Sequence, residues 1–174
     1  MSTNMLNELI VIGGGAAGML AAGTAAEQRA RVVLLEPNDR LGKKLYITGK
    51  GRCNVTNDCP PEDFFKNVPR NPRFLYSSIY AFPPSSMMEL LERLGCPLKT
   101  ERGARVFPQS DRSASVIDAL RAYLRAGGVQ VKRCRAEEIL TENGAVFYFN
   151  VYEIAPYAAG LQTAEIRYES GAFS

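Results

Sequence analysis

The sequence predicts an α/β fold in which a parallel sheet carries a helix after its first strand. Three observations support this prediction: an apolar run at residues 9–12, a glycine-rich turn that opens a small-residue stretch to residue 29, and a second apolar run at residues 31–35. Short continuous apolar runs are typical of strands that are buried on both faces. A strand, a helix and a second strand in close succession form the unit from which parallel sheets are built.

The turn between the first strand and the helix, residues 13–18, reads GGGAAG. In such a turn Gly13 permits a tight exit from the strand, Gly15 leaves room for a pyrophosphate, and Gly18 lets the helix pack closely on the sheet. The start of the helix presents free N–H groups and a partial positive charge to the phosphates. Glu36 closes the second strand, where a carboxylate accepts hydrogen bonds from ribose hydroxyls. The sequence therefore predicts a Rossmann-like dinucleotide site.

Residues 9–26 carry no charge, a length that also suits a membrane span or a signal sequence. However, the stretch is rich in Gly and Ala rather than Leu and Phe, and no Lys or Arg precedes it. A buried strand followed by a helix that packs on a sheet explains the same composition. We therefore expect neither a membrane partner nor a secretory leader.

The overall composition restricts the chemistry that is available. With 174 residues, 46% of them hydrophobic, the chain can bury one core of ordinary size. It has no histidine, which excludes histidine acid–base catalysis and removes most zinc sites, so we expect no metal centre. The four cysteines are scattered without a CxxC pair, which favours reduced thiols in the cytoplasm.

Charge is distributed unevenly along the chain. Residues 1–135 hold 20 Lys or Arg against 12 Asp or Glu, a net of +8, and residues 136–174 hold one Arg against six Glu, a net of −5, which together give +3. Basic charge in the first part suits a phosphate-bearing cofactor. Because this charge is spread singly rather than in runs, we expect no nucleic-acid partner.

After Glu36 the sequence changes character. Residues 37–40 are typical of a turn, and residues 41–57, LGKKLYITGKGRCNVTN, follow neither a helical nor a strand period. This segment combines glycines, cations and short polar residues, a mixture typical of an extended loop whose N–H groups and cations face an anion or a polar ring. A solvated basic loop is the alternative interpretation.

Three helices are predicted further along the chain. The first follows Asn71, as its cap, and Pro72 at its first position. The second opens with a capping box at residues 86–89 and ends at Gly95. The third covers residues 113–126 and ends at a pair of glycines. These helices make a helical insertion in the nucleotide-binding fold.

Short strands are predicted around these helices. Residues 105–108, RVFP, lie between the second and third helices and are typical of a short strand. Residues 129–131 and 136–140 are expected to form a strand and its continuation, which returns to the parallel sheet.

Four pieces of the sequence carry a resemblance to a known family: VIGGGAAGMLAA, LLEPNDRLGKKLYITGKGRCNVTN, ERGARVFPQSDRSASVIDAL and GGVQVKRCRAEEI. They resemble the N-terminal part of a family of bacterial FAD-dependent oxidoreductases that includes aminoacetone-oxidase-like and 3-dehydro-bile acid Δ4,6-reductase-like flavoproteins. The resemblance covers roughly residues 7–140, and GRCNVTN with its LGKK lead-in is its most specific part. It implies that residues 1–140 are the N-terminal part of a Rossmann-like FAD-binding domain, incomplete and with a helical insertion.

The resemblance implies FAD as the cofactor and indicates where FAD would bind. The pyrophosphate would lie over residues 13–18 and the adenosine ribose on Glu36, and Ala136 would offer adenine a backbone contact. Lys43 and Lys44 would lie near the phosphates or the adenosine, and residues from 51 to 54 along the ribityl chain or the isoalloxazine. The implied cofactor-binding residues are Gly13, Gly15, Ala16, Ala17, Gly18, Glu36, Lys43, Lys44, Gly51, Arg52, Cys53, Asn54 and Ala136.

The same resemblance implies the chemistry. A small-molecule substrate would exchange a hydride with the flavin, and NAD(P)H or oxygen would complete the cycle. An Arg or a row of N–H groups near the flavin would stabilise its reduced form. No catalytic residue can be assigned from the sequence. Cys53 and Cys59 lie six residues apart in a loop, which is no dithiol signature, so we expect no redox-active disulfide.

Residues 141–174 depart from the pattern. The resemblance ends after about residue 147, and seven of the 16 aromatic residues lie between residues 147 and 173. A strand or hairpin at residues 145–154 and 163–168 is one interpretation of this tail, and a truncated or frame-shifted gene end is the other. In either case we expect a chain that is not competent alone and that associates or dimerises through an exposed sheet face.

Three functions follow from these observations. The first is an FAD-dependent oxidoreductase that acts on a small carbonyl, amine or enone compound. The second is a nucleotide-binding fold without catalysis, as a remnant or as one part of a split protein. The third, an NAD-binding Rossmann module, is disfavoured because GRCNVTN has no role there.

Overall fold

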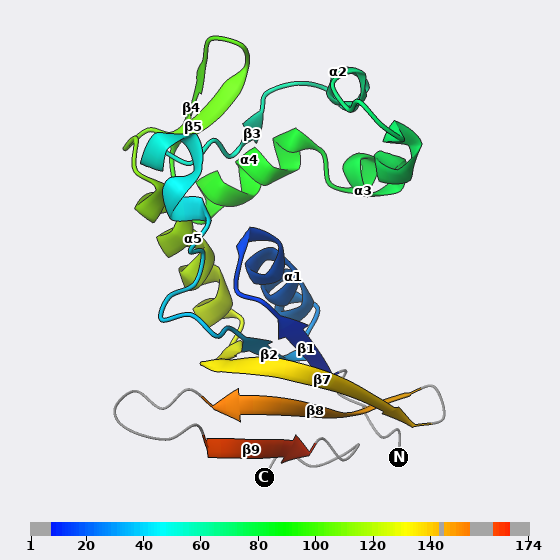
Figure 1. Ribbon diagram of the computed structural model, residues 1–174. Helices are drawn as coiled ribbons and strands as arrows, with labels where there is room; N and C mark the ends of the chain where they lie inside the picture. The colour runs from blue at the N-terminus through cyan, green and yellow to red at the C-terminus, as the bar shows by residue number, and fades with distance from the viewer. Residues whose placement is uncertain (1–7, 143–144, 154–161, 168–174) are drawn as a thin grey trace, which may run out of the picture. The chain divides into compact units, whose positions relative to one another are not determined.

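The computed structural model describes residues 8–142, 145–153 and 162–167 (Figure 1). The chain divides into two compact units: unit 1 combines Met1–Leu41 with Leu124–Ser174, and unit 2 is Gly42–Tyr123. Unit 2 is therefore an insertion in the sequence of unit 1. It holds the predicted helical insertion apart from residues 124–126, the end of the last helix, and unit 1 holds the glycine-rich turn.

Unit 1 is built on a parallel sheet with the strand order β1, β2, β6 (Figure 1). The strands are β1 (Glu8–Ile12), β2 (Arg31–Leu35) and β6 (Gln130–Lys132). β1 and β2 pair along their whole length, from Glu8 opposite Arg31 to Ile12 opposite Leu35. The predicted α/β fold with a parallel sheet is confirmed.

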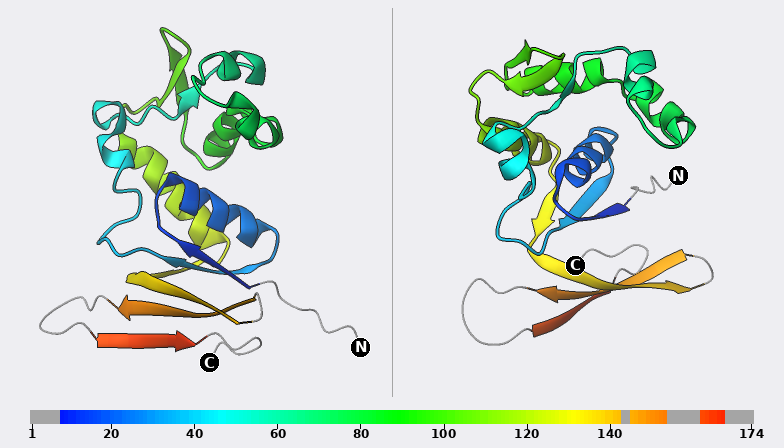
Figure 2. Two further views of the ribbon diagram at one scale, coloured as in Figure 1. Left: turned by 45° about the vertical axis from the view of Figure 1, so that its right-hand side comes forward. Right: turned by 45° about the horizontal axis from the view of Figure 1, so that its top comes forward.

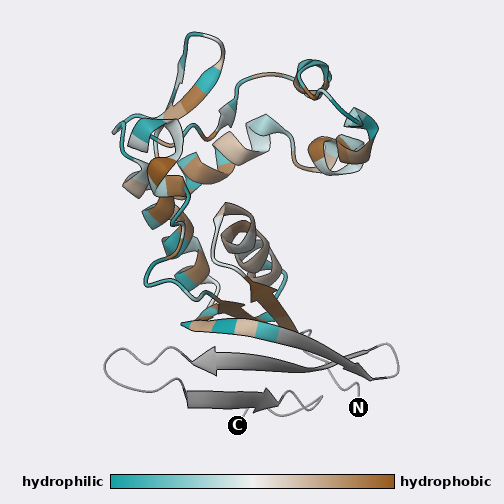
Figure 3. Ribbon diagram, viewed as in Figure 1, coloured by the Kyte–Doolittle hydropathy of each residue, from teal (hydrophilic) through white to brown (hydrophobic). Residues whose placement is uncertain are grey.

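Helix α1 (Ala16–Glu27) connects β1 to β2, as the sequence predicts. Its residues Met19 and Ala22 are fully buried. In β2 all residues from Val32 to Leu35 are at most 4% exposed, the pattern of a central strand that is covered on both faces. Figure 3 shows β1 and most of β2 in the brown of apolar residues. The uncharged stretch at residues 9–26 is thus accounted for by a strand and a helix that packs on the sheet.

A second sheet in unit 1 is antiparallel, with the order β7, β8, β9 (Figure 2). These strands are β7 (Cys134–Glu142), β8 (Ala145–Glu153) and β9 (Gln162–Arg167). The tail therefore contains the strand pair that one interpretation of the sequence predicted. The described strands of the tail bond to each other and not to the parallel sheet.

The prediction that residues 136–140 return to the parallel sheet is wrong. On this side of β2 the paired strand is β6, and after Arg133 the chain enters β7, whose backbone bonds to β8. Cys134 and Ala136, at the two-residue period of a strand, pack against Val33 and Leu35 of β2. Cys134 and Ala136 thus contribute apolar side chains to the core of unit 1 while their backbone belongs to a different sheet.

Unit 2 contains a small antiparallel sheet in the order β3, β5, β4. Its strands are β3 (Thr56–Asn57), β4 (Leu98–Glu101) and β5 (Arg105–Pro108). The predicted strand RVFP is therefore confirmed with its bounds. It is the central strand, and Val106 and Phe107 are buried.

Two longer helices carry the core of unit 2. α5 (Ser113–Ala126) has the predicted bounds, and Ile117 and Leu120 on its inner face are buried. α4 (Pro84–Arg93) begins before the predicted capping box, because Pro84 suits a first helical position where no N–H is needed. Gly95, with a left-handed φ of 80°, ends α4 as predicted.

The segment between β3 and α4 is irregular. It contains α2 (Pro61–Lys66), which the sequence analysis missed, a 3₁₀ turn η2 (Pro72–Leu75) and α3 (Tyr76–Ala81). The prediction that Asn71 caps the helix that begins at Pro72 is wrong. The φ of Asn71 is 45°, and its side chain makes no capping bond. A true cap residue has an extended backbone, which brings its side chain to the free N–H groups.

Candidate nucleotide-binding site

The glycine-rich turn joins β1 to α1 and is fastened to the neighbouring strand. The backbone N–H of Gly13 donates to the carbonyl of Leu35 at 2.8 Å, and the φ of Gly13 is 99°, a value that side chains rarely tolerate. A methyl group on Gly18 would overlap the carbonyl oxygen of Gly13. The fold itself therefore requires glycine at these two positions.

Gly15 differs from both of these glycines. Its backbone is extended, with φ −77° and ψ −174°, and a Cβ atom there would meet no protein atom within 4 Å. Neither backbone strain nor packing within the protein explains a glycine at this position. A diphosphate that approaches the backbone would explain it, because a side chain would occupy the ligand's space.

Gly15 is also the residue that precedes the first turn of α1. No side chain caps this helix end and its first turn holds no acidic residue. The following residues, Ala16 and Ala17, are exposed. A helix of 12 residues that starts in this way presents N–H groups and a partial positive charge to solvent, which is the arrangement that binds phosphate.

Glu36 lies at the end of β2 and is directly connected to the glycine-rich turn. Its side chain is buried, and its Oε2 accepts the backbone N–H of Gly14 at 2.7 Å. Its Oε1 accepts the backbone N–H of Asn38 at 2.8 Å and the side-chain Nδ2 of the same residue. A methyl group on Gly14 would overlap Leu41 and crowd Glu36. The turn and the residues after β2 are therefore tightly interlocked around one carboxylate.

The second group of predicted residues lies in unit 2. Lys43 and Lys44 are exposed, and the loop after them forms the 3₁₀ segment η1 (Leu45–Gly51), in which Gly49 and Lys50 both have left-handed backbones. The predicted irregular loop is thus two short turns joined by a kink. Gly51 also has a positive φ, of 87°.

Cys53 follows η1 and is almost completely buried. Its backbone has a φ of 61° and its N–H donates to the carbonyl of Thr48 at 3.0 Å. Burial raises the pKa of the Cys53 thiol, an effect that a side-chain hydrogen bond with Thr48 partly offsets. A buried, protonated thiol at this position packs inside the loop and is no exposed nucleophile.

Arg52 points into a cluster of charges on unit 2. Its Nε donates to Asp111 at 2.7 Å, and its terminal nitrogens donate to Glu101 and Asp111. The guanidinium also stacks over the Phe107 ring, 4.2 Å from its centroid, and Lys99 donates to Asp111 at 2.6 Å. Hydrogen bonds from Arg52 lower the pKa of Glu101, and bonds from Lys99 and Arg52 lower that of Asp111. Arg52 thus fastens the loop to β4 and to the residues after β5.

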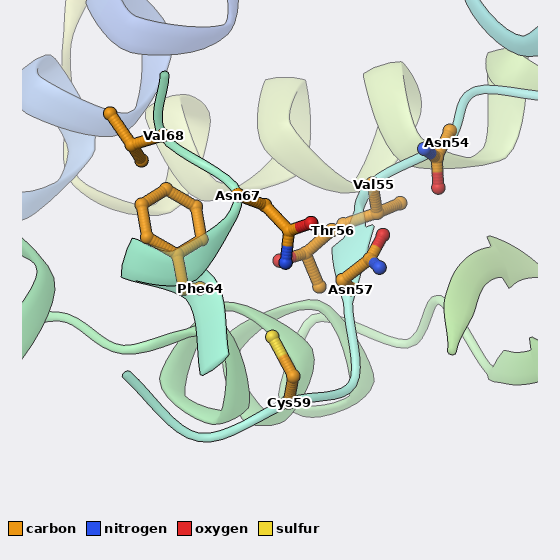
Figure 4. A pocket seen from close by; sticks show the side chains of 8 residues that line it. All are labelled: Asn54, Val55, Thr56, Asn57, Cys59, Phe64, Asn67 and Val68. Atoms are coloured by element: carbon orange, nitrogen blue, oxygen red, sulfur yellow. The ribbon is translucent and has the colours of Figure 1, made fainter. Parts of the chain in front are cut away.

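A pocket of about 500 Å³ lies beside the second half of GRCNVTN (Figure 4). Figure 4 shows Asn67 and Thr56 facing each other and the Phe64 ring beside Val68. No charged side chain is among its lining residues, which are Asn54, Val55, Thr56, Asn57, Cys59, Phe64, Asn67 and Val68. Three amides, a hydroxyl and an aromatic ring suit an uncharged polar ring rather than a phosphate.

The structure therefore brings together two separate sets of predicted residues. In unit 1 the turn at residues 13–18 and Glu36 form one connected group, and Ala136 packs beside β2. In unit 2 Arg52, Cys53 and Asn54 form the second group. Sequence reasoning missed Asn38 and the two carboxylates that bind Arg52. Only the short spacing of Asn38 from Glu36 could have signalled a role.

Among the residues that the structure describes, no helix is both long and apolar enough to cross a membrane.

The strand, glycine turn, helix and acidic strand end together define a nucleotide-binding Rossmann domain. The profile of the HI0933-like protein Rossmann domain matches residues 7–159, and the chain belongs to this family. The match reaches beyond residue 147, after which the resemblance that we saw in the sequence ends.

Two curated proteins show the relationship in more detail. The chain is 35% identical over 128 residues to the 3-dehydro-bile acid delta(4,6)-reductase of Clostridium scindens, an alignment that covers 72% of this chain and 31% of that protein. It is 28% identical over 130 residues to the ribosomal RNA dihydrouridine synthase of Escherichia coli, covering 75% of this chain and 32% of that protein. The chain thus spans about a third of the length of these relatives.

Solved structures share the fold at low sequence identity. THI4 from Thermovibrio ammonificans has a TM-score of 0.57 and 14% identity, covering 84% of this chain and 47% of that one. A quinol–fumarate reductase has a TM-score of 0.58 and 15% identity, covering 84% of this chain and 30% of that one.

Proposed function

We propose that this chain is the FAD-binding part of a flavin-dependent oxidoreductase. The observation that carries the proposal is Gly15, a glycine that the fold does not require, at an uncapped helix start beside a buried carboxylate. The residues present fit a dinucleotide: the turn at residues 13–18 would hold the pyrophosphate, and Glu36 the adenosine ribose. Ala136 would offer its backbone to adenine, and Lys43 and Lys44 would lie near the phosphates or the adenosine.

When bound, FAD supplies hydride exchange with a small organic substrate such as a carbonyl, amine or enone compound, and NAD(P)H or oxygen is the partner that completes the cycle. The chain's own residues would bind FAD and orient it. Residues 51–54 would lie along the ribityl chain or the isoalloxazine, and the uncharged pocket beside Asn54 suits a polar ring. Arg52 is held by two carboxylates, so we propose that it fixes the shape of this loop and that backbone N–H groups meet the flavin.

The test is the cofactor of the purified 174-residue chain. We expect visible flavin absorbance after reconstitution, and FAD bound in preference to NAD and NADP. Tight binding of NADH with exclusion of FAD would identify the chain as an NAD-binding module instead.

We further propose that this chain alone does not turn over substrate, because it spans about a third of the length of its curated relatives. Catalysis requires the substrate to be held against the flavin with water excluded, and such positioning supplies about 7–11 kcal/mol of barrier reduction. Oxidation of NAD(P)H or small amines by the FAD-loaded chain at about 1 per second or faster would contradict this. An FAD-loaded but inactive chain would also fit the alternative of a non-catalytic nucleotide-binding remnant, and activity on adding the segments of a relative that lie outside the alignment would separate the two.

A further inference from the structure

Asn38 lies two residues after Glu36 and outside the glycine-rich turn. Both of its donors, the backbone N–H and the side-chain Nδ2, bond to the same oxygen of Glu36, Oε1. The other oxygen, Oε2, accepts the N–H of Gly14 at 2.7 Å. The carboxylate is thus held from the turn on one side and from Asn38 on the other.

The local sequence explains this arrangement. Pro37 follows Glu36 and has no N–H, so Asn38 carries the first backbone donor after the acid. Asn is also the residue whose short amide readily bonds to nearby groups in a turn. Gly14 bonds to Oε2 and Asn38 bonds to Oε1, so both oxygens of the Glu36 carboxylate are held in a defined orientation.

We propose that Asn38 is a positioning residue for ribose recognition: it fixes the Glu36 carboxylate so that the site selects nucleoside diphosphates with an intact ribose 2′,3′-diol. This inference rests on the proposed function. Asn38 itself touches no phosphate in this scheme and acts through the orientation of one carboxylate. Without the Nδ2 bond the carboxylate is restrained by one bond fewer, and ribose binding must remove the freedom that it gains, which lowers affinity.

The test uses ADP and 2′,3′-dideoxy-ADP as probes of the full chain, measured by isothermal titration calorimetry. We expect the natural sequence to bind ADP about tenfold more tightly than the dideoxy compound, a difference of about 1.4 kcal/mol. Asn38→Ala should weaken ADP binding by about tenfold and change dideoxy-ADP binding by less than roughly twofold. Asn38→Ser, which keeps a side-chain donor, should recover part of the preference. Asp39→Ala, the exposed neighbour, is the matched control and should behave like the natural sequence.

The outcomes separate a positioning role from a structural one. Equal weakening of both nucleotides in Asn38→Ala means that the residue only supports the fold, and it overturns the inference. Retention of the natural preference in that variant overturns it as well. If Asn38→Ala does not fold, the ratio of the ADP affinity to the dideoxy-ADP affinity in Asn38→Ser decides instead. If the natural sequence binds neither ADP nor FAD, the proposed function fails and this inference fails with it, whereas binding of both without diol discrimination refutes the inference alone.

Discussion

Replacing Gly15 with valine separates nucleotide binding from folding. The backbone of Gly15 has φ −77° and ψ −174°, an extended conformation that valine readily adopts, and the added side chain meets no protein atom within 4 Å at its first carbon. The remaining cost is the loss of a favourable residue at the start of a helix, roughly 1 kcal/mol or less. We therefore expect Gly15→Val to fold with nearly the natural stability.

The same side chain occupies the space that we assign to the pyrophosphate. If it displaces two N–H bonds to the phosphates, each worth about 1.5–3 kcal/mol for a charged acceptor, the loss is about 3–6 kcal/mol. That loss corresponds to a fall in FAD affinity of roughly two to four orders of magnitude. Quenching of flavin fluorescence measures the affinity, and urea unfolding followed by circular dichroism measures the stability.

Gly18→Ala is the comparison variant, which should impair folding where Gly15→Val impairs binding. A methyl group there would overlap the carbonyl oxygen of Gly13, a backbone atom that cannot move without displacing the turn, so this change should destabilise the fold by about 1–3 kcal/mol or more. The reasoning is refuted if Gly15→Val binds FAD within about threefold of the natural sequence, less than 1 kcal/mol, or if it unfolds as readily as Gly18→Ala.

Other predictions can be checked with the same preparations. Glu36→Ala should weaken FAD binding by about 1–3 kcal/mol, the loss of a hydrogen-bonded charged partner, as measured by titration calorimetry. In the folded state a hydrogen bond from Arg52 lowers the pKa of Glu101, and bonds from Lys99 and Arg52 lower that of Asp111. The contribution of these carboxylates to stability is therefore complete above their unfolded pKa, about 4, and is lost as the pH falls through their folded pKa. The natural sequence should therefore have a higher free energy of unfolding than Arg52→Met at pH 7, and the difference should shrink towards pH 3. If urea unfolding gives the same difference at both pH values, the charge cluster does not stabilise the fold in this way. Cys59 is partly exposed while the other three cysteines are buried, so iodoacetamide should alkylate Cys59 first, which peptide mass spectrometry would show.

The sequence by itself determined the elements whose signals are local. The unit β1–α1–β2 could be predicted because buried parallel strands and a glycine turn leave continuous patterns over a few residues. The same holds for α5 and for the strand RVFP, which have the predicted bounds. The steric demands on Gly13 and Gly18 also follow from the motif, because the turn imposes them on its own backbone.

Only the tertiary structure decided which distant segments meet. Residues 136–140 have the composition of a strand in either sheet, and only the structure shows that they pair with the next strand, β8, rather than with β2. The partners of Arg52 lie 49 and 59 residues away, at Glu101 and Asp111, and no local pattern indicates that these carboxylates converge on one guanidinium. Likewise, the bond between Gly14 and Glu36 spans 22 residues and exists because parallel strands bring their carboxyl ends to one edge of the sheet. Asn38 reaches the same carboxylate from only two residues away, but only the structure shows that both of its donors bond to one oxygen of Glu36.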